Sequence, residues 1–179
     1  MNQIIIFVAQ YFFILVILLL IVSWYYVSKP KRLEYIVTVI VAGIIAFVLS
    51  RIASKLYYDP RPFVVEHVKP LFPHLKDNGF PSDHALLTGT LTAVAYIYNK
   101  KFASYMLVIT ILIGTARVLA KVHSPLDITG GWLMGVIGAY LGYKLSVWLI
   151  HKYYKGNLKQ KADTLIDFLS LDSINKTVK

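Results

Sequence analysis

Residues 4–22 read IIIFVAQYFFILVILLLIV, an apolar run that only Gln10 interrupts. A helix needs about 20 such residues to cross the hydrocarbon core of a bilayer. No charged residue precedes Lys29, and the neutral start of the chain differs from the basic start of a secretory signal peptide. The run therefore predicts a retained transmembrane helix, with the aromatic residues 24–26 in an interfacial belt at its end.

Four further uncharged runs indicate more transmembrane helices along the chain. They lie at residues 35–50, 85–99, 102–116 and 128–143. The hydrophobic content of 57% and the mean hydropathy of +0.60 exceed those of an ordinary soluble domain. The sequence predicts an all-α, polytopic membrane helix bundle with about five transmembrane helices. The later runs are short, so their polar ends are expected at or just below the interface, where other parts of the protein satisfy them.

Lysine and arginine gather in alternate connections, which sets the predicted orientation. They follow the first, third and fifth runs: Lys29, Lys31, Arg32, Lys100, Lys101, Lys152, Lys155, Lys159 and Lys161. By the positive-inside rule these segments are cytoplasmic. We expect residues 1–151 to form one transmembrane domain whose loops 51–84 and 117–127 lie on the non-cytoplasmic face. Residues 152–179 are expected as a polar cytoplasmic tail, either an amphipathic helix or a weakly ordered segment.

Composition also excludes several classes of function. The chain has no cysteine, so disulfides, thiolate nucleophiles and Cys-ligated metals are absent. Its net charge of +10 could suggest nucleic acid, but the basic residues separate apolar runs instead of forming one soluble face, so no nucleic-acid partner is expected.

The segment from Arg117 to Asp127 has an informative spacing. Ser124 suits the N-cap of a helix, Pro125 its first position, and Asp127 its third, where a carboxylate can bond back to the cap amide. Asp127 is equally placed to accept a hydrogen bond from His123 and to fix the tautomer that leaves its other ring nitrogen free as a nucleophile. Asp127 can cap the helix and orient His123 at the same time.

Two arginines and a second histidine lie at the predicted outer ends of other runs. Arg61 and Arg117 could neutralise phosphoryl oxygens with planar guanidinium groups, or could instead snorkel to lipid headgroups. Ser82 begins the third helix as a candidate N-cap facing an anion. His84 follows in the first turn, where it could donate a proton to a leaving oxygen or be merely interfacial.

Taken in order, Arg61-Pro, then Pro-Ser82-Asp83-His84, then Arg117-x5-His123-x3-Asp127 resembles the motif set of the type 2 phosphatidic acid phosphatase superfamily. The resemblance implies that His123 is the nucleophile of a phosphohistidine intermediate, Asp127 its orienting partner and His84 the acid. The residues that it implies in phosphate binding are Arg61, Arg117, Ser82, Lys55 and Asp83. Three positions depart from the pattern: Lys55 lies one residue closer to Arg61, Asp83 replaces a glycine, and Ala116 replaces a serine.

Pro81-Ser82-Asp83-His84 together with residues 58–64 is similar to the bacterial undecaprenyl pyrophosphate phosphatase branch. That resemblance implies hydrolysis of the terminal phosphate of a polyprenyl pyrophosphate, and the alternatives are phosphatidate or phosphatidylglycerophosphate as substrate. No metal site and no cofactor are expected, since the arginines neutralise the charge. Catalytic roles are not expected for Glu66, His67 and His74 in the loop.

Other hypotheses remain open. A haloperoxidase-like pocket holding vanadate is disfavoured because those relatives resemble soluble helical proteins. Lipid-phosphate binding without hydrolysis, as in a transporter or scramblase, is disfavoured by the intact His123, and a purely structural protein by the gathering of polar residues on one side. The oligomeric state is undetermined, although Gly131 and Gly135 form a small-x3-small pair suited to close helix contact.

Overall fold

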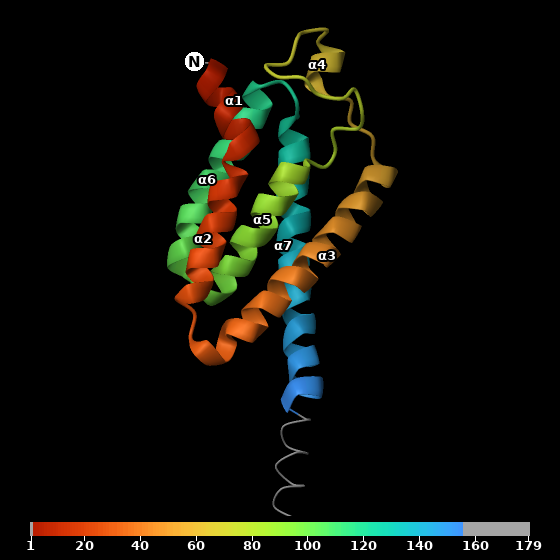
Figure 1. Ribbon diagram of the computed structural model, residues 1–179. Coiled ribbons are helices and arrows are strands. Elements are labelled where there is room, and N and C mark those ends of the chain that lie inside the picture. Colours follow the sequence, from red (N-terminus) through yellow and green to blue (C-terminus); the bar gives the residue numbers. More distant parts are fainter. Residues whose placement is uncertain (1, 156–179) are drawn as a thin grey trace, which may run out of the picture.

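The computed structural model describes residues 2–155, and within them every regular element is a helix (Figure 1). In chain order they are α1 (Asn2–Tyr11), α2 (Phe13–Tyr25), η1 (Lys29–Lys31), α3 (Arg32–Leu56), α4 (Pro62–Val65), α5 (Asp83–Tyr98), α6 (Lys100–Leu119), α7 (Pro125–Leu149) and η2 (Ile150–Lys155). The predicted all-α membrane bundle is confirmed. The predicted tail begins within η2, and from residue 156 it lies outside the described residues.

Three helical segments are long and apolar enough to cross a membrane: Lys29–Leu56, Lys100–Leu119 and Pro125–Tyr153. The first predicted helix is not straight, because α1 and α2 meet at a 44° bend, and together they make a fourth candidate span. The third predicted helix is α5, which has only 16 residues and would rise about 24 Å at 1.5 Å per residue. It is shorter than the hydrocarbon core is thick.

α5 lies at the centre of the bundle and packs against α2, α3, α6 and α7. Its buried positions are small or polar as well as apolar, and the hydroxyls of Thr88 and Thr90 donate to the carbonyls of His84 and Leu86 one turn earlier. The helix thereby satisfies these two threonines with its own backbone, and the hydroxyl of the third buried threonine, Thr92, lies 3.0 Å from that of Thr110 in α6. At the C-terminal end of α5, the Tyr98 hydroxyl lies 2.8 Å from the hydroxyl of Thr38 and anchors α5 to α3.

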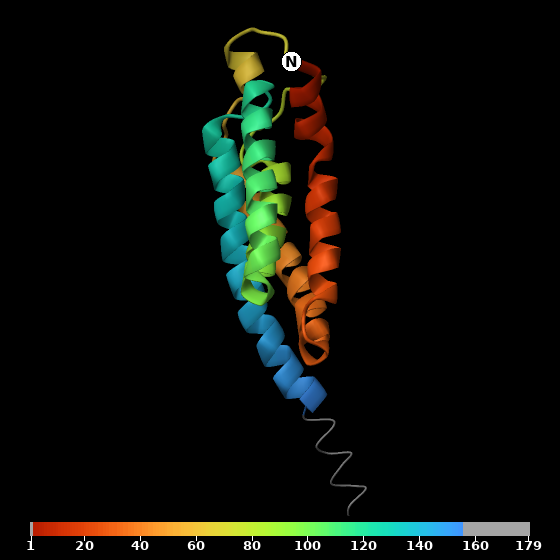
Figure 2. The same ribbon diagram turned by 90° about the vertical axis from the view of Figure 1, so that its left-hand side faces the viewer.

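The N-terminus of α5 begins deeper in the bundle than the ends of α1 and α6 (Figure 1). The loop that contains α4 lies at the same end as the N-terminus of the chain in both views (Figures 1 and 2). Residues of this loop and of the first turn of α5 line one cavity, at the end where the sequence predicts the non-cytoplasmic face.

Glycines allow α7 to pack closely on two neighbouring helices. A Cβ at Gly135 would lie 2.7 Å from the backbone nitrogen of Thr90 in α5, and one at Gly138 would lie 2.6 Å from the Cβ of Ala46 in α3. Gly131 and Gly142 are similarly confined, against Ser82 and Ala42. The close contacts predicted for the glycines of this helix are thus made inside one chain, and α7 joins α3 to α5.

We expect Gly138→Ala to destabilise the protein, because an added methyl must displace α3, and such overpacking typically costs about 1–3 kcal/mol. Gly43→Ala is the matched control, since nothing lies within 4 Å of its added Cβ. Thermal unfolding in detergent should show a lower midpoint for Gly138→Ala and no decrease for Gly43→Ala. Equal midpoints for the two variants would contradict the close α3–α7 packing.

Candidate active site

The first turn of α7 contains the predicted capping box. The Ser124 hydroxyl accepts from the backbone N–H of Asp127 at 3.1 Å, and the Asp127 carboxylate accepts from the backbone N–H of Ser124 at 2.8 Å. Pro125 occupies the first helical position, where its missing N–H costs nothing. The local sequence therefore fixes a fully buried carboxylate beside the residue that precedes the helix.

That residue is His123, whose Nδ1 lies 3.1 Å from Oδ2 of Asp127. Its other ring nitrogen, Nε2, lies 3.3 Å from Nη1 of Arg61 and 3.2 Å from Nη2 of Arg117. Because guanidinium groups can only donate, Nε2 is the acceptor, and Nδ1 carries the proton that it donates to Asp127. Asp127 thus both caps α7 and orients the imidazole.

Arg61 and Arg117 are 5% and 4% exposed, which contradicts the alternative that they snorkel to the headgroups. Arg61 donates from Nη1 to the carbonyl of Val122 and from Nε to Oδ1 of Asp77, both at 2.7 Å. Arg117 donates from Nη1 to the carbonyl of Ala9 at 3.1 Å. Each guanidinium is fixed on one side by protein oxygens and turned toward His123 on the other.

Asn78 holds the long loop in place. Its Oδ1 accepts from the backbone N–H groups of Asp59 at 2.9 Å and Phe80 at 3.0 Å, and its Nδ2 donates to the carbonyls of Ser54 and Tyr57, both at 2.9 Å. One side chain therefore ties the end of α3 to the start and the end of the loop. This arrangement places Arg61 and the start of α5 in a fixed relation.

Asp59 and Gly79 join the same loop to α7. Oδ2 of Asp59 accepts from the Ser124 hydroxyl at 2.7 Å, and its carbonyl accepts from the backbone N–H of Gly79 at 2.8 Å. A Cβ at Gly79 would lie 2.7 Å from Oδ2 of Asp127. The loop can approach the capping carboxylate this closely only because position 79 has no side chain.

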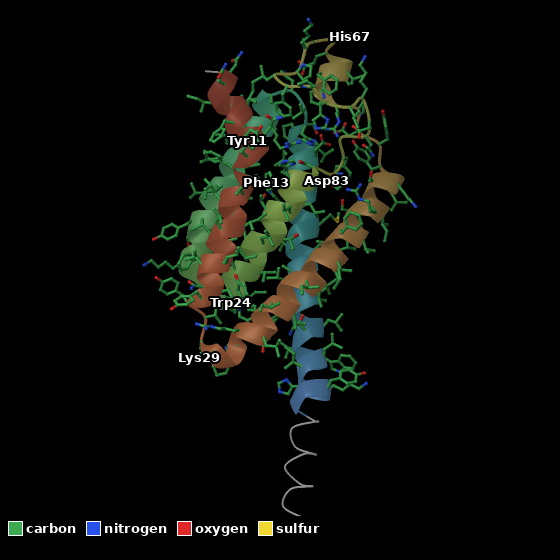
Figure 3. All side chains as sticks on the ribbon, viewed as in Figure 1. Tyr11, Phe13, Trp24, Lys29, His67 and Asp83 are labelled. Atoms are coloured by element: carbon green, nitrogen blue, oxygen red, sulfur yellow. The ribbon has the colours of Figure 1, made fainter. Side chains whose placement is uncertain are left out.

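The three sequence motifs, which contain Arg61, residues 81–84 and residues 117–127, meet around a cavity of about 310 Å³. In Figure 3, nitrogen and oxygen atoms gather at the end of the bundle marked by Asp83, whereas Trp24 and Lys29 mark the opposite end. The residues that line the cavity are Arg51, Ser54, Arg61, His74, Asp77, Asn78, Phe80, Pro81, Asp83, His84, Arg117 and His123. Topology thus brings five of the predicted site residues together.

His84 lines this cavity from the first turn of α5, and its ring meets Phe13 of α2 edge-on with centroids 5.4 Å apart. Asp83, beside it, forms an ion pair with Arg51 of α3. The acidic side chain therefore faces a cation of its own, which offsets its repulsion of an anion in the cavity.

Two predicted phosphate-binding residues lie outside the lining of the cavity. Lys55 is exposed in the last turn of α3. Ser82 is fully buried at the N-cap of α5, but its hydroxyl makes no capping bond and has no hydrogen-bond partner among the described residues. Its backbone N–H donates instead to the carbonyl of Asp127 at 3.0 Å, so Ser82 links the starts of α5 and α7.

Sequence reasoning missed several residues of the site, of which His74 is the most central. Its Nε2 lies 3.4 Å from Nη2 of Arg117, and its ring centroid lies 6.0 Å from that of His123. Glu66, by contrast, pairs with Lys121 at 2.8 Å, and neither it nor His67 lines the cavity. No motif distinguished His74 from the other loop histidine. Arg51 did carry a signal in the sequence, because it is a basic residue in a loop that the sequence predicts on the non-cytoplasmic side, where basic residues are disfavoured.

Burial and nearby positive charges favour the neutral forms of two histidines of the cavity, His123 and His74. Burial, then the charges of Arg117 and Arg61, lower the pKa of His123 well below its ordinary value. Burial and the same two arginines also lower the pKa of His74. At Asp77, burial raises the pKa, but the hydrogen bond and charge of Arg61 outweigh it, so the pKa is lowered and the carboxylate stays ionised.

This arrangement suits a tetrahedral oxyanion. Two guanidinium groups offer charged donors to its oxygens, and the unprotonated Nε2 of His123 faces the same space. A neutral imidazole so placed can act as a nucleophile toward phosphorus, with Asp127 stabilising the positive charge that develops on the ring.

The lowered pKa of His123 predicts a defined pH dependence of stability. The unfolded chain binds a proton near pH 6.5 and the folded chain does not, so His123 stabilises the fold above about pH 6.5 and that contribution falls by up to ~1.4 kcal/mol per pH unit below it. Thermal unfolding between about pH 7 and about pH 5 should therefore show a smaller loss of stability in His123→Gln than in the wild type. Equal slopes would mean that His123 is protonated in the folded protein.

Comparison with known proteins gives a consistent result. Residues 31–151 match the family model of the PAP2 superfamily. The bacitracin transport permease protein BcrC of Bacillus licheniformis is 31% identical over 140 residues, which cover 78% of this chain and 68% of that protein. The undecaprenyl-diphosphatase BcrC of Bacillus subtilis (strain 168) is 28% identical over 148 residues, which cover 82% and 75%.

Similarity extends to an archaeal protein and to a solved structure. The undecaprenyl-diphosphatase of Sulfolobus acidocaldarius is 28% identical over 149 residues, 81% of this chain and 70% of that one. The crystal structure of LpxE from Aquifex aeolicus superimposes with a TM-score of 0.57 at 23% identity, over 79% of this chain and 93% of that chain. At this identity, the superposition supports the shared fold.

Proposed function

The chain belongs to the PAP2 superfamily and is a multi-pass membrane phosphatase, and from this premise we propose that it hydrolyses the terminal phosphate of a polyprenyl diphosphate, undecaprenyl diphosphate above all, through a phosphohistidine intermediate. The observation that carries the mechanism is the position of Nε2 of His123 between the guanidinium groups of Arg61 and Arg117. The names of the curated relatives support the choice of substrate.

In the first step, Nε2 of His123 attacks the terminal phosphorus while Arg61 and Arg117 donate to its oxygens. The anhydride P–O bond breaks, and the bridging oxygen leaves with its electron pair on the lipid monophosphate. His84 is the proposed acid for that oxygen, and the negative phosphate favours the protonated form of its imidazole. Water then attacks phosphohistidine, with His84 as base, and releases orthophosphate.

Two other functions have less support. A phosphatase of phosphatidate or phosphatidylglycerophosphate would use the same nucleophile and the same arginines, and pocket shape alone would separate the substrates. A lipid-phosphate binder without activity would not require a neutral imidazole that a carboxylate orients so that Nε2 carries no proton. Lys55 and Ser82 stay predictions as phosphate ligands, since neither lines the cavity.

The decisive measurement is phosphate release by the purified protein from undecaprenyl diphosphate and from phosphatidate, with EDTA present. His123→Ala should lower release by at least about 10³-fold, because removing a nucleophile eliminates the covalent route. His67→Asn is the matched control, since it replaces an exposed histidine outside the cavity and asparagine tolerates its φ of 52°.

Trapping radiolabelled phosphate on the wild-type protein, and not on His123→Ala, would support the intermediate. Equal release by wild type and His123→Ala would overturn the mechanism. Preference for phosphatidate would leave the mechanism in place and reject the proposed substrate.

We also propose that the cavity faces the non-cytoplasmic side. The chain has no cysteine, so single introduced thiols report position without background. In intact cells, a membrane-impermeant maleimide should label Lys69→Cys, near the cavity end, and should label Lys31→Cys only after the membrane is opened. The reverse pattern would place the cavity on the cytoplasmic side.

A further inference from the structure

Arg51 is a third arginine of the cavity, and none of the sequence motifs contains it. It lies in α3, where its Nη2 donates to Asp83 and to the Ser50 hydroxyl at 3.3 Å, and its Cζ lies 5.1 Å from the centroid of the Phe47 ring. Its side chain is 45% exposed. Arg61 and Arg117 are deeply buried, so Arg51 stands at the rim of the cavity.

The pair formed by Arg51 and Asp83 leaves donors available. Both recorded bonds of the Arg51 guanidinium use Nη2, and its Nη1 and Nε make no hydrogen bond within the described residues. A guanidinium has five N–H groups, so it can hold the Asp83 carboxylate and still bind a second anion. The Asp83 carboxylate then positions the Arg51 guanidinium without occupying all of its N–H donors.

The place of the leaving group links this pair to the chemistry. An in-line displacement puts the leaving oxygen on the side of phosphorus opposite the nucleophile, here opposite His123. His84, the proposed acid, must lie within reach of that oxygen. Arg51, Asp83 and His84 line the same cavity, so a leaving group within reach of His84 shares that cavity with the pair formed by Arg51 and Asp83.

We propose that Arg51 binds the second, non-transferred phosphate of a lipid diphosphate and that Asp83 positions its guanidinium, an inference that rests on the proposed function. When the bond from the terminal phosphorus to the bridging oxygen breaks, the electron pair remains on the departing lipid monophosphate. Arg51 stabilises that added negative charge. A lipid monophosphate has no second phosphate, so when it is the substrate the leaving group is the lipid alcohol, whose oxygen is protonated by His84. Arg51 is therefore a specificity-determining residue for diphosphates.

The test compares Arg51→Gln, Asp83→Asn and the wild-type protein on a polyprenyl diphosphate and on the matching polyprenyl monophosphate. Arg51→Gln should lower kcat/KM for the diphosphate by about 10- to 100-fold, the usual loss for a hydrogen bond between charged groups, and should leave the monophosphate within about threefold. Asp83→Asn retains the Arg51 cation but loses the carboxylate that positions it, so it should lower kcat/KM for the diphosphate by a smaller factor than Arg51→Gln and leave the monophosphate within about threefold. Lys69→Gln controls for the loss of one exposed positive charge outside the cavity.

A purely structural link between α3 and α5 gives a different pattern. In that case Arg51→Gln and Asp83→Asn would lower the thermal midpoint alike and would lower kcat/KM for both substrates by the same factor. That result would overturn the assignment while leaving the phosphatase activity established.

Inhibition separates this inference from the choice of substrate. Methylenediphosphonate carries two phosphonates, and its inhibition constant should be at least about 10-fold higher for Arg51→Gln than for the wild type. The inhibition constant of orthophosphate should be equal for both proteins. If the wild type hydrolyses only lipid monophosphates, the proposed substrate fails, and unchanged inhibition by methylenediphosphonate would then reject the second phosphate site as well.

Discussion

Two guanidinium groups share one imidazole nitrogen inside an apolar helix bundle, and the rest of the site follows from this arrangement. Like charges in a medium of low polarity repel each other, and each must also replace the water that it has lost. Asp77 and the carbonyls of Val122 and Ala9 supply part of that replacement. A neutral His123 supplies the rest, because a charged imidazole between two arginines would add a third positive charge.

The depth of the site is a consequence of helix length. α5 is too short to reach the height of its neighbours, so its polar first turn begins inside the bundle and the loop with α4 covers it. Asn78 and Asp59 fix that loop to α3 and α7 through hydrogen bonds, and the backbone N–H of Gly79 donates to the carbonyl of Asp59 within the loop. The same bonds also position Arg61, which lies in this loop.

α7 connects the packing of the bundle to its chemistry. Its glycines bring it against α3 and α5, and its capping box fixes His123 at the end of the same rigid element. The starts of α5 and α7 are joined by the bond from Ser82 to Asp127, so the two catalytic candidates His84 and His123 are positioned by backbone contacts close to each side chain. Displacement of either helix would change the distance between them.

Local rules predicted much of this protein from its sequence. Apolar runs determined the helices, since lipid solvates only apolar side chains, and the order Ser124, Pro125, Asp127 determined the start of α7, since capping depends on residues within one turn. The predicted site residues Arg61, Asp83, His84, Arg117 and His123 lie around one cavity. Only the tertiary structure decided the bend between α1 and α2, the burial of both arginines, and the roles of Asn78, His74 and Arg51, because these depend on contacts between segments far apart in the chain. It also decided that Lys55 and Ser82 lie away from the cavity lining, since helix phase and the approach of α7, not spacing along the chain, set where those side chains lie.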